Sequence, residues 1–122
     1  MKSKPPAPPK LPALMSALEE NQHDVPTFIT AIFGGGNACH EVLKQYREGR
    51  LSQMNMKIMG VSSLDPHANG FVYAREMGIL TTTDYTDLYA VDGLNLIIEL
   101  TGSEEVVKDL LRTKPRGVAL LD

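Results

Sequence analysis

The chain has few of the features that mark several large classes of protein. It contains one cysteine, Cys39, so no disulfide can form within it, and a reducing compartment such as the cytoplasm fits. Its 12 Lys and Arg residues form no long block, and its net charge is −3, which argues against a nucleic-acid footprint. No apolar run approaches the ~20 residues of a membrane span. Residues 1–4 lead into prolines rather than an apolar segment, so we expect no signal peptide.

Spacings typical of a metal site are also missing. His40 directly follows Cys39, and adjacent residues on a helix do not face each other, which makes them a poor pair of ligands. His23 and His67 are isolated in expected loops. We therefore expect no bound metal.

The length of 122 residues suits one domain, and 43% hydrophobic residues are enough for a core. A separate substrate domain, as in a two-domain dehydrogenase, would need roughly 100 residues more. The chain ends just after its last expected strand, which suggests a piece of a longer protein.

The most informative segment is an apolar run, residues 28–33, that leads into Gly34, Gly35 and Gly36 and then into a segment able to form a helix. Glycines let backbone N–H groups approach a pyrophosphate closely, and the positive end of the following helix points at the same spot. The spacing Gly34-x-Gly36-x-x-Cys39 supplies the first two glycines of the dinucleotide fingerprint and puts a cysteine at the third.

Strand and helix patterns alternate after this turn. We expect strands at 27–33, 56–61, 79–82, 94–100 and 117–121, and helices at 37–47, 69–77, 84–89 and from Ser103 to Pro115. Asn37 is expected as the N-cap of the first helix, with Ala38 on its inward face, and Leu111 as inward on the last helix. Alternation with apolar strands predicts an α/β fold with a doubly wound parallel sheet of about five strands, in the order 3-2-1-4-5.

The first 22 residues differ from the rest. Residues 1–10 are rich in Lys and Pro and are expected to form a flexible arm. Residues 11–22 predict an amphipathic helix whose stripe is Leu11, Leu14, Met15 and Leu18. The stripe either covers one edge of the domain or mediates association, and we expect a homodimer because an exposed stripe marks an interaction site.

The strand order reverses between strands one and four, and ligands bind at such a point. Two segments should meet there, Gly34–Asn37 after strand one and Glu99–Gly102 at the end of strand four. Glu99 either touches a ribose or anchors its loop, or is a buried acid bonded to neighbouring amides.

Four segments carry a resemblance to known families: residues 60–66 (GVSSLDP), 74–79 (AREMGI), 83–88 (TDYTDL) and 96–102 (LIIELTG). In this order they resemble the N-terminal half of dinucleotide-binding oxidoreductases such as glucose–fructose oxidoreductase, homoserine dehydrogenase and aspartate dehydrogenase. More closely, the chain resembles the Rossmann-like domain ahead of PAS and histidine-kinase modules in some bacterial signalling proteins, where a Gly-Gly-Gly-x-x-Cys turn also occurs. The resemblance covers residues 27–122.

The resemblance implies NAD or NADP as cofactor, with binding residues at three strand ends. They are Gly34, Gly35, Gly36 and Asn37 after strand one, Ser62, Ser63 and Asp65 after strand two, and Glu99, Thr101 and Gly102 after strand four. Relatives that bind NAD hold the adenosine ribose with an acidic residue where this chain has Ser63. Asp65 either substitutes for it or caps the turn before Pro66, so the choice between NAD and NADP stays open.

Cys39 has two interpretations. In the first turn of a helix it is a candidate redox-sensing thiol, because helix N-termini favour thiolates. Alternatively it is a small buried residue at the helix–sheet contact.

No catalytic residue is apparent, because dehydrogenases place their acid–base groups on a second domain. We therefore expect a non-catalytic dinucleotide-binding sensory or regulatory domain of a bacterial signal-transduction protein, with PAS or kinase domains downstream. The alternative is the cofactor-binding half of an NAD(P)-dependent oxidoreductase. A third possibility is a degenerate domain used for dimerisation only.

Overall fold

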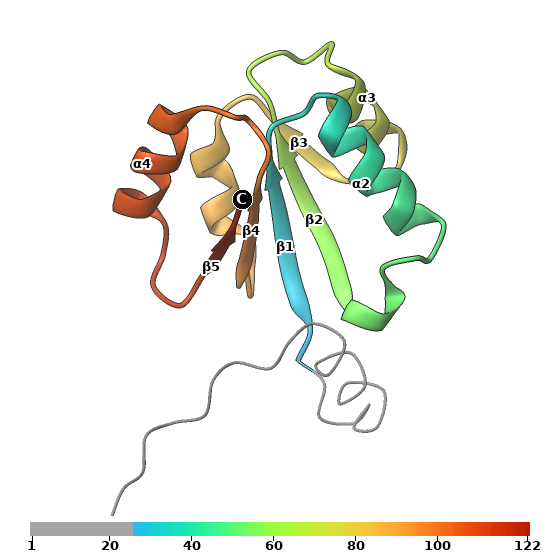
Figure 1. Ribbon diagram of the computed structural model, residues 1–122, viewed down its shortest axis with the longest axis horizontal. Coiled ribbons are helices and arrows are strands. Elements are labelled where there is room, and N and C mark those ends of the chain that lie inside the picture. The colour runs from blue at the N-terminus through green and yellow to red at the C-terminus, as the bar shows by residue number, and fades with distance from the viewer. Residues whose placement is uncertain (1–25) are drawn as a thin grey trace, which may run out of the picture.

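The architecture is a parallel sheet with helices on both faces (Figure 1). The structure, a computed structural model, describes residues 26–122. The expected arm, the amphipathic helix at 11–22 and its dimer contact lie outside these residues. None of the helices between residues 26 and 122 has the length and apolar composition of a transmembrane span.

The sheet has five strands in the order β3-β2-β1-β4-β5, all parallel, as the alternation predicts. The strands are β1 (Phe28–Phe33), β2 (Met56–Ser62), β3 (Leu80–Thr82), β4 (Leu96–Glu99) and β5 (Ala119–Leu121). In the described part of the chain the α-helices are α2 (Asn37–Arg47), α3 (Asn69–Glu76) and α4 (Glu104–Thr113), and the 3₁₀ helices are η2 (Ser52–Met54) and η3 (Tyr85–Ala90).

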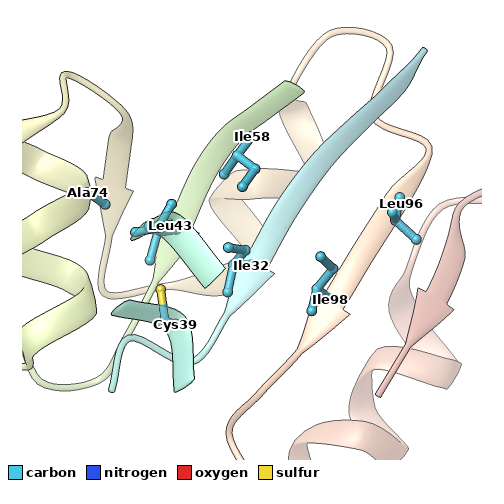
Figure 2. Close-up of a cluster of buried hydrophobic side chains, with 8 residues drawn as sticks. Ile32, Cys39, Leu43, Ile58, Ala74, Leu96 and Ile98 are labelled. Carbon is cyan, nitrogen blue, oxygen red and sulfur yellow. The ribbon is translucent and has the colours of Figure 1, made fainter. Parts of the chain in front are cut away.

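Each face of the sheet buries its own cluster of apolar side chains. On one face, α2 and α3 pack over Ile32, Ile58 and Ile98, and Figure 2 shows Leu43 of α2 and Ala74 of α3 beside them. On the other face, Leu88 of η3 and Leu110 of α4 pack on Phe33 and Ile97. Because β1 and β4 contribute to both clusters, their runs are mostly apolar, as is typical of buried parallel strands; the exceptions are Thr30 and Glu99.

Two expected helix boundaries depend on caps, and the structure confirms them. Ser103 Oγ accepts a hydrogen bond from Val106 N (3.3 Å) at the start of α4. Before η3, Asp84 Oδ1 accepts hydrogen bonds from Thr86 Oγ (2.7 Å) and Thr86 N (3.0 Å). These two bonds, the side-chain bond first, lower the pKa of the Asp84 carboxyl. The segment it caps is a 3₁₀ helix.

Three expectations about single residues are wrong. Asn37 is the first residue of α2, not its N-cap; Gly36 occupies that position, and Asn37 Oδ1 instead accepts from Asn69 Nδ2 of α3 (2.7 Å). Ala38 is exposed, while its neighbour Cys39 is buried. Leu111 is 62% exposed because α4 turns Leu110 to the sheet in its place.

The fourth strand is shorter than its apolar run, for a physical reason. Asn95 Oδ1 accepts a hydrogen bond from Ile29 N (2.9 Å), and Asn95 Nδ2 donates to Thr27 O (2.9 Å). The Asn95 side chain thus bonds backbone groups at the start of β1, and β4 begins at the residue after it, Leu96.

Candidate functional site

A cavity of about 460 Å³ opens at the carboxyl ends of the central strands. Phe33, the last residue of β1, is in register with Ser62 of β2 and Glu99 of β4, so the three loops that follow start side by side. The volume lies in the range of small-molecule sites. The lining residues are Phe33, Gly34, Gly35, Gly36, Ser62, Ser63, Leu64, Asp65, Ala68, Thr83, Tyr85, Leu100, Thr101, Ser103 and Val106.

Two of the three glycines after β1 are required by the protein's own packing. Gly34 has a φ of +115°, and a Cβ there would lie 2.7 Å from Leu100 C and 2.8 Å from Thr101 N. A Cβ on Gly35 would lie 2.5 Å from Ser63 Cβ. The turn therefore fits tightly between the loops that follow β4 and β2.

Gly36 has no such constraint. Its backbone is extended (φ −85°, ψ −151°), a conformation open to other residues, and a Cβ there would meet nothing within 4 Å. Gly36 is exposed, lines the cavity and is the N-cap of α2, where no side chain caps the helix. The open space beside it therefore borders the uncapped, positive end of an 11-residue helix.

The glycine turn also holds the start of α3. Gly35 O accepts hydrogen bonds from Gly70 N (2.7 Å) and Phe71 N (3.0 Å), while Ala68, the N-cap of α3, has no side-chain bond of its own. Gly34 N donates to Ser62 O (2.8 Å). The turn is thus fixed to both β2 and α3 before any ligand arrives.

Cys39 occupies the third position of the fingerprint, and the structure supports its interpretation as a small buried residue. It is fully buried, and Figure 2 shows its sulfur among the side chains between α2 and the sheet. A Cβ on Gly70 of α3 would lie 2.7 Å from Cys39 Cβ, so the two helices touch where α3 has no side chain. Burial raises the pKa of the Cys39 thiol to about 12, which opposes a thiolate and hence a redox-sensing role.

We therefore expect native Cys39 to react with a thiol reagent at pH 8 at least about tenfold more slowly than in urea, because only unfolding exposes it. The folded-state pKa is raised, so stability from the buried thiol is present below pH 9. It declines as the pH rises towards 12, because the unfolded chain ionises first. Stopped-flow modification with and without urea checks the first point. Equal rates under the two conditions would restore the redox interpretation.

The loop between β2 and α3 is held by its own side chains. Ser63 Oγ donates to Asp65 O (3.0 Å) and accepts from Asp65 N (3.2 Å), and Asp65 Oδ1 accepts from His67 N (2.9 Å). Asp65 thus caps its turn, as one interpretation of the sequence has it, and it also lines the cavity.

The loop between β4 and α4 is organised by Glu99. This side chain is buried, with Oε1 accepting from Thr101 N (3.0 Å) and Oε2 from Thr101 Oγ (2.6 Å). Thr101 Oγ in turn accepts from Ser103 N (3.0 Å). Glu99 and Gly102 line a second cavity of about 660 Å³, beside this loop and α4, and not the first one. Glu99 therefore anchors its loop through neighbouring groups.

Seven of the ten residues expected at the site line the first cavity: Gly34, Gly35, Gly36, Ser62, Ser63, Asp65 and Thr101. Asn37, Glu99 and Gly102 do not. Within residues 26–122, no three His, Cys, Asp or Glu side chains gather in a way that could hold a metal ion.

Tyr85 lines the cavity and was not among the site residues expected from the sequence. Its ring stacks against Phe33 (5.1 Å between centroids), and its hydroxyl donates to Asp109 of α4. That bond, with burial, raises the pKa of Tyr85 to about 12, so the phenol stays protonated. Only the pairing of η3 with α4 reveals this wall of the cavity, and no sequence signal marks it.

No protein-family model matches the sequence, and no curated protein matches it. The fold is similar to that of S. aureus homoserine dehydrogenase. The crystal structure at pH 7.0 aligns with a TM-score of 0.56 at 19% identity, over 79% of this chain and 26% of that one. The structure at pH 6.5 gives 0.55 at 19% identity, over 77% and 25%.

This chain thus spans about a quarter of the length of homoserine dehydrogenase. The match agrees with the oxidoreductase part of the expected resemblance and with the Rossmann-like fold. The expected link to PAS and histidine-kinase proteins gains no support from these matches.

Proposed function

We propose that residues 26–122 bind the pyrophosphate of NAD or NADP in the first cavity and serve as the cofactor-binding part of an oxidoreductase. The observation that carries this proposal is Gly36. Its backbone needs no glycine and its missing side chain leaves open space, while Gly34 and Gly35 beside it are required by packing. A glycine that the protein does not need, at an uncapped helix N-terminus, is explained by a phosphate that must approach the backbone.

The rest of the cavity fits such a ligand. The backbone around Gly36 and the first turn of α2 would hold the phosphates, the loop with Ser63 and Asp65 would border the adenosine ribose, and Thr101 would border the nicotinamide ribose. When bound, the nicotinamide ring supplies hydride transfer. The chain's own part is to position the cofactor, because Gly34 and Gly35 fix the turn against two neighbouring loops.

The oxidoreductase role is better supported than the sensory role that the sequence also suggested. The solved structures to which this fold is similar are of a dehydrogenase, and the chain spans about a quarter of its length. Substrate-binding groups on another part of the protein would therefore accord with the proposal. The sensory role has no comparable observation in its favour.

Calorimetric titration with NAD, NADH, NADP, NADPH, ATP and coenzyme A tests the proposal. We expect heat of binding with at least one nicotinamide dinucleotide, and weaker binding of its AMP and nicotinamide mononucleotide halves, because each half leaves part of the cleft unfilled. Absence of heat with all six ligands, from protein shown to be folded by circular dichroism, would contradict the proposal.

A further inference from the structure

We propose that the cleft selects the dinucleotide without a 2′-phosphate, NAD(H) over NADP(H), and that Asp65 sets this preference. The inference rests on the proposed function, because it concerns the same cavity. It decides a choice that the sequence leaves open.

The first observation is the charge of the lining. Within residues 26–122, Asp65 is the one acidic or basic residue in the cavity lining, and it follows the strand that borders the adenosine end in this fold. A phosphate monoester carries about −1.5 to −2 charges at pH 7. A 2′-phosphate would therefore face a carboxylate with no lysine, arginine or histidine in the lining to offset the repulsion.

The second observation is that the Ser63 hydroxyl, directly after the strand, already makes hydrogen bonds within its own loop. Ser63 Oγ donates its proton to Asp65 O and accepts from Asp65 N, so it has no donor left for a phosphate oxygen. Asp65 Oδ1 accepts from His67 N. Within residues 26–122, Asp65 Oδ2 accepts no hydrogen bond, and it is available to accept from ribose hydroxyls.

The two basic residues that follow Asp65 most closely in the sequence, His67 and Arg75, do not change this balance. Arg75 Nη2 donates to Pro66 O (3.2 Å), and its guanidinium lies over the Phe71 ring, 5.4 Å from the centroid. His67 is exposed on the same loop. Neither residue lines the cavity. The Arg75 head group is already held by a carbonyl and a ring, and recruiting it to a phosphate would break both contacts.

The test measures the dissociation constants of NADH and NADPH for the wild-type chain, Asp65→Asn and the control Asp92→Asn, with circular dichroism to verify folding. Asparagine keeps the oxygen that accepts from His67 N but removes the charge. Asp92 is exposed in the loop before β4, at the opposite end of the sheet, and matches the charge change. We expect wild-type and control to bind NADH about tenfold more tightly than NADPH, from one carboxylate–phosphate repulsion in water. Asp65→Asn should reduce the ratio of the NADPH dissociation constant to the NADH dissociation constant several-fold.

Different failures have different meanings. If NADPH binds the wild-type chain as tightly as NADH, the preference is wrong while the proposed function stands. An unchanged ratio in Asp65→Asn would remove Asp65 from the explanation. If neither dinucleotide binds, the proposed function fails and this inference with it. A measurement without variants is also decisive: added salt should weaken the preference, because it screens the repulsion, and a salt-independent ratio would overturn the assignment.

Discussion

Gly36→Val is expected to lower dinucleotide affinity at least about 100-fold while leaving the unfolding temperature close to that of the wild-type chain. The valine side chain would occupy the open space beside the α2 N-terminus, where the pyrophosphate is proposed to sit, and would cost the phosphate its bonds to backbone N–H groups. Folding should survive because, among residues 26–122, no atom beyond the two chain neighbours lies within 4 Å of the added Cβ and the backbone is already extended. Calorimetry with the tightest dinucleotide, together with thermal melting, measures both quantities.

Ala119→Val is the control for this variant. Ala119 is exposed in β5, in register with Leu96 at the start of β4, and it is outside the cavity lining. The control should bind like the wild-type chain. If Gly36→Val binds equally well, the space beside Gly36 holds no phosphate, and the main support for the proposed function is gone.

Gly34→Ala is expected to have the opposite profile, with a loss of about 3 kcal/mol in the free energy of unfolding. A residue with a Cβ is strained at a φ of +115°, which costs about 1–2 kcal/mol. The new Cβ would also lie 2.7 Å from Leu100 C and 2.8 Å from Thr101 N, both backbone atoms that cannot move without shifting the β4–α4 loop.

Gly49→Ala separates these two contributions. Gly49 has a φ of +80° but open space around it, so alanine there should cost about 1 kcal/mol from the backbone conformation alone. Urea unfolding followed by circular dichroism gives both values. Equal losses in the two variants would show that the contact between the glycine turn and the β4–α4 loop is not tight.

The sequence predicts this fold well because local patterns and chirality suffice. Apolar strands that alternate with helices require a parallel sheet covered on both faces, and right-handed crossovers leave few strand orders. The first glycine turn is equally readable, because three glycines directly follow an apolar strand. What the sequence cannot supply is the partner of a polar side chain. Asn95 shortens β4 by bonding Thr27 and Ile29, residues more than 60 positions away.

The candidate site divides in the same way. Gly34, Gly35 and Gly36 can be recognised in the sequence as part of the site because their roles depend on the local backbone and not on distant side chains. Asp65 is ambiguous in the sequence because it both caps its own turn and lines the cavity. Tyr85 reaches the cavity wall only because η3 packs beside α4 on the same face of the sheet, a tertiary arrangement that no local pattern reveals.

The contact between α2 and α3 changes what the third glycine of the fingerprint means. At this contact the position without a side chain is on α3, where a Cβ on Gly70 would lie 2.7 Å from both Cys39 Cβ and Gly36 O. Here Cys39 keeps its side chain and Gly70, opposite, has none. The requirement therefore belongs to a pair of facing residues and not to one position in the chain. A sequence motif that requires glycine at position 39 would miss this turn, whereas a motif that also considers the facing residue of α3 would include it.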